Sequence, residues 1–180
     1  EQKDDWSFRR SRWFNAVEKE CKNVRENVGL LDMTAFAKCR IKGPGAEEFL
    51  DNLVANKLPK KIGRINLCHA LNTKGGVHSE FTIMREAENS FYLVSAGAFQ
   101  RLDHDWILRW MPNDGSVQFE NLTNSTGVLV VSGPKARELM KRVSKDDFSN
   151  ENFKWLSAKN VDVGYAPVNA MRVNLSLIHI

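Results

Sequence analysis

The sequence has 180 residues, of which 42% are hydrophobic and 27% are charged, with a net charge of +4. This is the size and composition of one globular domain whose core needs neither disulfides nor metals. No apolar run approaches the roughly eighteen residues of a membrane span. The three cysteines, Cys21, Cys39 and Cys68, are far apart and form no CxxC pair, which argues against a disulfide framework or a zinc site. We therefore expect a soluble protein of a reducing compartment.

Basic and aromatic residues alternate near the start of the chain, in FRRSRWF, where Arg9, Arg10 and Arg12 lie among aromatic side chains. This pattern raises a nucleic-acid hypothesis. The excess positive charge is small, however, and acidic residues follow all the basic clusters except this one. We expect residues 1–14 to form an arm whose aromatic side chains pack on the body, and no nucleic-acid partner. The rival hypothesis requires an affinity that falls steeply with salt.

A helix is predicted over residues 15–28, where apolar side chains recur at helical spacing up to a break at Gly29. The stretch AKCRIK, residues 37–42, alternates as a strand does. A Gly43-Pro44 corner follows, and then a helix whose apolar side comprises Phe49, Leu50, Leu53 and Val54.

This order of strand, Gly-Pro corner and helix occurs a second time, in GVLVVSGPKARELMKRV. Proline in the first helical turn loses no hydrogen bond, because that amide has no partner within the helix. The buried stripe of the second helix is predicted to be Leu139, Met140 and Val143. The two copies predict a duplicated α+β unit.

Short β segments separated by turn residues lie between the two copies and predict an antiparallel arrangement. A helix over residues 98–111 is expected to bury its aromatic and aliphatic side chains and to carry His104 and Asp105 near its outer side. The predicted strands are INLCHAL, VHSEFTIM, FYLVSA, VQFEN, GVLVVSG and VNAMRVN.

Cofactor motifs are weak in this chain. The corner GPGAEE has Glu48 where a dinucleotide fingerprint needs its third glycine, so we expect no FAD or NAD site here. The histidines show no pair at metal-ligand spacing, and we expect no metal. His69 is interpreted as a histidine with its hydrogen bonds satisfied at a strand end.

The stretch KGGVHSEFTI contains Glu80, a carboxylate that could be either solvated or functional. Alternation places Val77, Ser79, Phe81 and Ile83 on one face of the predicted strand, and His78, Glu80 and Thr82 on the other. A glutamate in this position is more often solvated than functional. Spacing alone leaves both readings open.

Seven blocks decide between them, because together they resemble a known family. The blocks are FRRSRWF, GLLDMTAFAKCRIKG, LDNLVAN, NTKGGVHSEFTI, FYLVSAGA, GVLVVSGPKAR and PVNAMRVN. In order and spacing, from about Ser7 to Asn174, they are similar to the tetrahydrofolate-binding domain of the aminomethyltransferase (glycine cleavage T-protein) family. The version found in dimethylglycine and sarcosine dehydrogenases is the most similar.

The resemblance implies an α+β fold with antiparallel sheets covered by the helices of the duplicated unit. It also implies that Glu80 is a catalytic carboxylate in a pocket largely closed to water, where it stabilises a cation and takes a proton. The remaining folate-binding positions would be Phe36, Leu67, Thr82 and Val94. Ala96 stands where aminomethyltransferases have an asparagine.

The resemblance further implies a parent enzyme that passes a one-carbon unit to tetrahydrofolate and gives 5,10-methylene-tetrahydrofolate. A flavin domain upstream in the same polypeptide would carry FAD. The folate would be the small-molecule partner, and no membrane partner is implied. The compartment would be the cytoplasm, or the mitochondrial matrix in a eukaryote. A stand-alone aminomethyltransferase and a non-catalytic regulatory relative remain alternatives. We expect a folate-binding domain over residues 15–174, incomplete at its C-terminus, and a foreign tail over residues 175–180.

Overall fold

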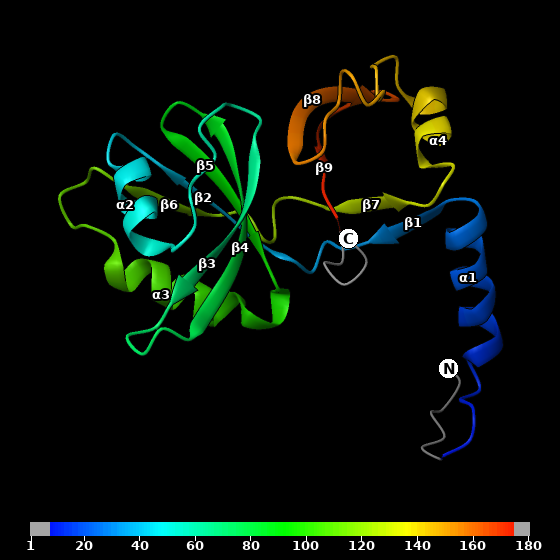
Figure 1. The fold of residues 1–180 in the computed structure, drawn as a ribbon, viewed down its shortest axis with the longest axis horizontal. Coiled ribbons are helices and arrows are strands. Elements are labelled where there is room, and N and C mark those ends of the chain that lie inside the picture. Colours follow the sequence, from blue (N-terminus) through cyan, green and yellow to red (C-terminus); the bar gives the residue numbers. More distant parts are fainter. Residues whose placement is uncertain (1–7, 175–180) are drawn as a thin grey trace.

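The computed structural model describes residues 8–174, and its centre is an antiparallel sheet of five strands (Figure 1). β3, β4 and β5 are the strands expected between the repeated units, and they form successive hairpins. In their order across the sheet, the strands are β3 Ile65–Leu71, β4 Val77–Ala87, β5 Ser90–Ser95, β2 Ala37–Lys42 and β6 Gln118–Asn121.

Two helices cover one face of this sheet, α2 (Ala46–Leu53) and α3 (Gln100–Trp110), the latter entered through the 3-10 turn η1 (Gly97–Phe99). Side chains alternate along each strand, so every second residue points at these helices. Burying that much apolar surface is the main source of the stability of the fold. The buried cluster comprises Cys39, Ile41, Ala46, Phe49, Leu50, Val54, Leu58, Cys68, Ala70, Phe81, Ile83, Phe91, Leu93, Ile107 and Val117.

A β-bulge interrupts the β3–β4 hairpin at His78. Leu71 pairs with Val77, but Ala70 pairs with Ser79, so His78 is an extra residue on β4. The His78 ring stacks on Trp106 of α3, with the ring centroids 3.9 Å apart. The sequence-based expectation that His78 shares a face with Glu80 is therefore wrong, because the bulge turns the imidazole toward the helix side.

The rest of the chain forms a second region of short ladders on the other side of the sheet (Figure 1). Its small core contains Phe148, Phe153 and Val161. The helix α1 lies at the end of the molecule farthest from α2 and has no buried residue. The elements are α1 Phe14–Glu26, β1 Gly29–Asp32 paired with β7 Leu129–Ser132, α4 Ala136–Val143, and β8 Ser157–Val163 paired with β9 Ala166–Arg172.

The duplicated unit is present in the structure. β2, Gly43 and α2 form the first copy, and β7, Gly133 and α4 form the second, with helices of 8 residues each. Both glycines have a left-handed φ, +123° and +128°, and a Cβ on either would collide with a backbone oxygen of another segment. The predicted α+β fold with antiparallel sheets is confirmed.

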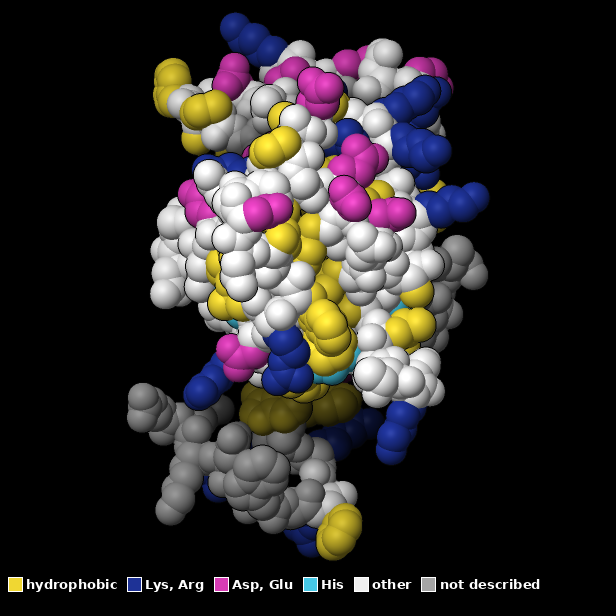
Figure 2. Space-filling view, turned by 90° about the vertical axis from the view of Figure 1, so that its left-hand side faces the viewer, with side chains coloured by type: hydrophobic (Ala, Val, Ile, Leu, Met, Phe, Trp, Pro, Cys, Tyr) yellow, Lys and Arg dark blue, Asp and Glu magenta, His cyan; other side chains and the backbone are white. Residues whose placement is uncertain are grey.

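Burial differs from expectation in two helices. The predicted buried stripe of α4 is wrong, since Leu139 and Met140 are only half-buried and Val143 is exposed. In α3 only Asp103 and Ile107 are buried, whereas Phe99, Leu102 and Trp110 are exposed. Figure 2, which views the side that carries α2 and α3, shows apolar side chains at the surface there. Helical spacing identified the apolar residues but not the partner each helix meets.

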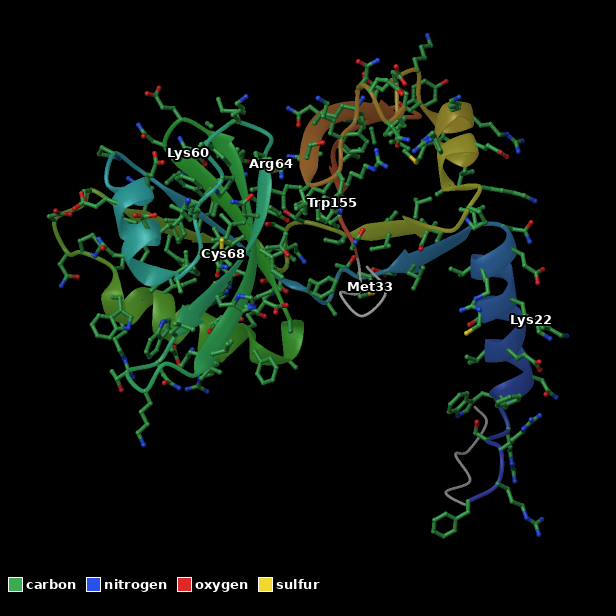
Figure 3. The ribbon with its side chains drawn as sticks, viewed as in Figure 1. Lys22, Met33, Lys60, Arg64, Cys68 and Trp155 are labelled. Carbon is green, nitrogen blue, oxygen red and sulfur yellow. The ribbon has the colours of Figure 1, made fainter. Side chains whose placement is uncertain are left out.

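The two regions meet at one end of the sheet (Figure 3). Arg64 donates to the carbonyl of Trp155 at 3.1 Å, and the Ile65 amide donates to the carbonyl of Leu156 at 3.0 Å. No helix within residues 8–174 is long and apolar enough to cross a membrane. The predicted tail, residues 175–180, and the start of the predicted arm lie outside the described residues.

Candidate functional site

The predicted folate-binding residues of the sheet lie in one row across it. Leu67 on β3 pairs with Thr82 on β4, which pairs with Val94 on β5. Residues that pair across strands point to the same side of the sheet. All three side chains are half-buried and lie on the face opposite to α2 and α3. Lys38 of β2 pairs with Val94 and completes the row.

Phe36 lies at the next level of this face, just before β2. Its amide donates to the carbonyl of Met33 at 3.0 Å, and its side chain is half-buried. Ala37 pairs with Ser95, so the register brings the residue before β2 beside Ala96. Gly97 follows, and a Cβ there would collide with the backbone oxygen of Ala35. The absence of a side chain at position 97 lets the two segments approach this closely.

Glu80 lies in the row next to Leu67 and Thr82, directly opposite His69. Its carboxylate oxygen Oε2 is 3.1 Å from His69 Nε2. The Glu80 side chain is 57% exposed. In the described residues the carboxylate is thus open to water, which differs from the closed pocket expected from the resemblance. It is nevertheless held by a specific partner.

Lys38 is a buried cation that the sequence-based reasoning did not single out. Its ammonium group donates to the carbonyl of Thr34 at 2.7 Å and to that of Phe36 at 2.8 Å. Burial lowers the pKa of this amine, and the nearby Asp32 carboxylate opposes that effect. The two hydrogen bonds fasten the segment that carries Phe36 to the edge of the sheet face.

The opposite end of the same face is covered. Ile65 and Met84 are buried there, and the Asn169 amide of β9 reaches the Met84 sulfur at 3.6 Å. Arg40 binds both oxygens of Glu86, with one distance of 2.8 Å, and also binds Glu120. The Arg40 hydrogen bond holds the pKa of Glu86 below its ordinary value. The face is therefore closed by β8 and β9 at one end and open at the Glu80 end.

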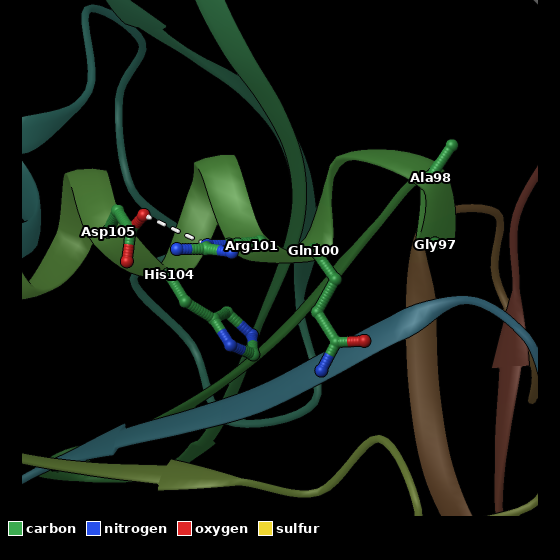
Figure 4. A pocket seen from close by; sticks show the side chains of 6 residues that line it. All are labelled: Gly97, Ala98, Gln100, Arg101, His104 and Asp105. Carbon is green, nitrogen blue, oxygen red and sulfur yellow. Dashed lines mark ion pairs between the residues drawn. The ribbon is translucent and has the colours of Figure 1, made fainter.

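A separate hollow of about 440 Å³ lies at the start of α3 (Figure 4). Arg101 and Asp105 form a long ion pair of 3.8 Å at its rim, and burial lowers the pKa of His104. None of the predicted folate-binding residues lines it. Its lining residues are Gly97, Ala98, Gln100, Arg101, His104 and Asp105.

The two buried thiols lie on the helix side of the sheet, away from this face. Within residues 8–174, no group of three or more His, Cys, Asp or Glu side chains is arranged to hold a metal ion. Cys39 and Cys68 are buried on the helix side, where desolvation raises their thiol pKa values to about 12 and about 11. Such thiols are poor nucleophiles.

The sequence matches a known domain family. A model of the GCVT N-terminal domain matches residues 3–176. The chain belongs to this family. The family consists of folate-binding domains, so the resemblance seen in the sequence is confirmed.

Two individual relatives show how similar the chain is to particular proteins. The chain is 36% identical over 169 residues to the mitochondrial dimethylglycine dehydrogenase of Rattus norvegicus, covering 93% of this chain and 20% of that protein. It is 31% identical over 175 residues to the mitochondrial pyruvate dehydrogenase phosphatase regulatory subunit of Mus musculus, covering 96% of this chain and 20% of that protein. The chain therefore spans about a fifth of the length of these relatives.

A solved structure shares the fold. The glycine cleavage system aminomethyltransferase T from Bartonella henselae superposes with a TM-score of 0.69, over 79% of this chain and 38% of that one, at 22% identity. This likeness agrees with the topology described above.

Three residues of the site were not predicted from the sequence: Lys38, His69, and Asn56, whose Oδ1 accepts from the His69 amide at 2.8 Å. Lys38 follows Phe36 by two positions, but nothing in the local pattern indicates a buried ammonium group. The expectation places His69 at a strand end, whereas it lies within β3, two residues before the last, and its ring faces Glu80. Counting outward from the NTKGG turn would pair it with Ser79, and only the bulge shifts the pairing to Glu80.

Proposed function

We propose that this chain binds a reduced folate on the open sheet face, and that Glu80 is the catalytic carboxylate of a one-carbon transfer. The observation that carries the proposal is the convergence of residues far apart in the sequence. Leu67, Thr82 and Val94 form one row of the face, and Phe36 and Glu80 lie at the next level along the strands. Apolar rows with a few polar groups at the edge suit a flat heterocycle.

The chemistry gives the carboxylate a task. A nitrogen of tetrahydrofolate attacks the carbon of a methylene iminium, a C–N bond forms, and the electron pair of the C=N bond moves to the departing amine. The attacking nitrogen becomes cationic and then loses its proton. Glu80 would stabilise this cation and accept the proton. The amine nitrogen would then take that proton and leave, while the second folate nitrogen bonds to the same carbon and loses its own proton to water, which gives 5,10-methylene-tetrahydrofolate.

We further propose a dimethylglycine or sarcosine dehydrogenase-like parent. The 36% identity to a dimethylglycine dehydrogenase supports this choice over a stand-alone aminomethyltransferase. In such a parent, a flavin domain elsewhere in the polypeptide would oxidise the N-methyl group with FAD and supply the iminium. A gene whose product carries a GxGxxG flavin module upstream of this chain would agree with the proposal. A gene without one would favour the aminomethyltransferase.

The regulatory alternative is favoured by one observation, the 31% identity to a phosphatase regulatory subunit. It predicts that the fold is kept without folate chemistry. If the parent protein that contains this chain binds no tetrahydrofolate at millimolar concentration, the regulatory alternative replaces the catalytic one.

Titration calorimetry with tetrahydrofolate tests the role of Glu80. We expect weak binding by the 180-residue chain, because the open face leaves the ligand partly in water. Glu80→Gln should weaken binding about tenfold, since it removes a charged hydrogen-bond acceptor at similar volume. Glu48→Gln on α2, on the far side of the sheet, is the matched control and should leave the affinity unchanged. Equal affinities of the wild type and Glu80→Gln would remove Glu80 from the mechanism.

A further inference from the structure

Asn56, His69 and Glu80 form a chain of hydrogen bonds at the open end of the sheet face. The backbone N–H of His69 donates to Asn56 Oδ1 at 2.8 Å. A backbone amide can only donate, so the Asn56 atom that faces it is the oxygen. The orientation of this side-chain amide is thus fixed by chemistry, although oxygen and nitrogen of an amide have the same shape.

The same oxygen determines the tautomer of the imidazole. His69 Nδ1 lies 3.3 Å from Asn56 Oδ1, which has a lone pair and no hydrogen to give. Nδ1 must therefore carry the hydrogen of this contact. In the neutral ring, Nε2 is then left with a lone pair, as an acceptor.

Nε2 faces a second acceptor. It lies 3.1 Å from Glu80 Oε2, and an ionised carboxylate offers only lone pairs. Two lone pairs at this distance repel unless a proton lies between them. Hydrogen bonds at both ring nitrogens therefore require one proton between Nε2 and Oε2. Within residues 8–174, neither group forms an ion pair with any other charged side chain, and Asn56 is neutral.

The pairing of His69 with Glu80 depends on a contact on the helix side of the sheet. The extra residue His78 shifts the pairing so that His69 lies opposite Glu80, and stacking on Trp106 fastens the bulge to α3. The Glu80 side chain is long and exposed, so without such a partner its carboxylate would rotate freely. His69 binds one oxygen, and the other oxygen has no hydrogen-bond partner among the described residues.

We propose that His69 is a positioning residue for Glu80. Through the shared proton it holds Oε2 and presents Oε1 to an N–H group of the ligand on the sheet face, while Asn56 fixes the imidazole for this task. The ligand part of this inference rests on the proposed folate function. The shared proton does not, because it follows from the contacts of the ligand-free chain.

The first test is made without ligand. Nitrogen NMR of the ¹⁵N-histidine-labelled chain, with His69 assigned from the signal lost in His69→Gln, reports which ring nitrogen is protonated. We expect Nδ1 of His69 to carry a hydrogen, in the Nδ1–H ring or in the imidazolium, and Asn56→Ala to shift the neutral ring toward the Nε2–H form. A wild-type neutral ring protonated at Nε2 would overturn the inference, whether or not folate binds.

The second test measures tetrahydrofolate binding and the protons taken up or released with it, by calorimetry in buffers of different ionisation enthalpy. His69→Ala should bind about tenfold more weakly, because Glu80 loses its anchor. His69→Gln keeps a donor to Oε2 but has no group that gains or loses a proton, so its affinity should return to near wild type. The pH dependence of its proton uptake should be lost. His104→Gln, a half-buried histidine on another element, is the control for folding and for the number of histidines.

The outcomes separate the two proposals. If the wild type binds folate and Glu80→Gln weakens binding, but both His69 variants behave as the wild type does, the positioning role is wrong and the folate function stands. If neither the wild type nor any variant binds folate, the proposed function fails. The NMR measurement then tests only whether His69 and Glu80 share a proton. Asn56→Ala provides a milder variant should His69→Ala lose its fold.

Discussion

The two copies of the strand, Gly-Pro corner and helix unit show how one local structure behaves in two environments. Each corner glycine has a left-handed φ, and each helix begins with a hydrogen bond back to that glycine. The residue two positions after the glycine donates to the segment that precedes the neighbouring strand. The equivalent bonds are Gly45 N–H to Ser116 O and Lys135 N–H to Asn27 O, both within 3.0 Å.

Their helices differ in burial. α2 buries Ala46, Phe49 and Leu50, whereas α4 has no buried residue. The difference comes from the surface that each helix contacts. α2 packs on a five-stranded sheet with a large apolar core, whereas the buried cluster beside α4 has three residues in the described part of the chain. The comparison teaches that a corner is encoded by its own few residues, but that the stability it yields depends on the surface it meets.

The largest effect should come from the buried helix of the first copy. Leu50→Ala removes a fully buried side chain from the main core, and we expect a loss of about 3 kcal/mol in the free energy of unfolding. Urea denaturation followed by circular dichroism measures it. Leu102→Ala on the exposed side of α3 is the control and should cost much less. A small loss for Leu50→Ala would mean that the core relaxes around the cavity.

The corners should respond alike. Gly43→Ala and Gly133→Ala each force a Cβ into a left-handed φ and against a backbone oxygen, so we expect each to cost about 2 kcal/mol. Gly127→Ala, where a Cβ would meet only ordinary contacts, is the control for glycine replacement. The same denaturation curves report all three variants. A strong effect at one corner with none at the other would break the equivalence of the two copies.

Met140 of α4 occupies the position equivalent to Leu50 but is only half-buried. Met140→Ala should therefore cost about 1 kcal/mol, because less apolar surface is lost. Hydrogen exchange read by mass spectrometry should show faster exchange in residues 136–172 and unchanged protection in β3 to β5. Equal loss of protection throughout the chain would show that the two regions unfold together.

The smallest effect concerns an ion network that only the first copy has. Arg40 of β2 lowers the pKa of Glu86, whereas its equivalent on β7 is Val130. A lowered folded pKa stabilises the fold above the ordinary glutamate value of 4.5, and this contribution is lost as the pH falls through the lower folded value. Glu86→Gln should flatten the acid side of the stability profile, as thermal unfolding between pH 7 and pH 3 would show. Parallel profiles for the wild type and the variant would contradict this role.

Much of the fold was accessible from the sequence because its signals are local. Alternation identified the strands from β2 to β6, and the Gly-Pro corners identified the repeat, since φ, ψ and apolar period depend on neighbouring residues. The residues from Phe36 to Val94 came from the resemblance to a family, because no local pattern relates positions so far apart. That resemblance also predicted the apolar positions of the candidate site, but it did not predict how exposed these side chains are.

The sequence by itself determined the strands β2 to β7 and β9, the two Gly-Pro corners and the helices, and the role of Glu80 remains a proposal. The tertiary structure alone decided which helix is buried, and that Glu80 rather than Ser79 lies opposite His69. The physical reason is that one extra residue in β4 changes the cross-strand partner of every residue beyond it, and that residue is held in place by Trp106 from another element. Pairing of this kind depends on contacts between distant segments, and those exist only once the chain has folded.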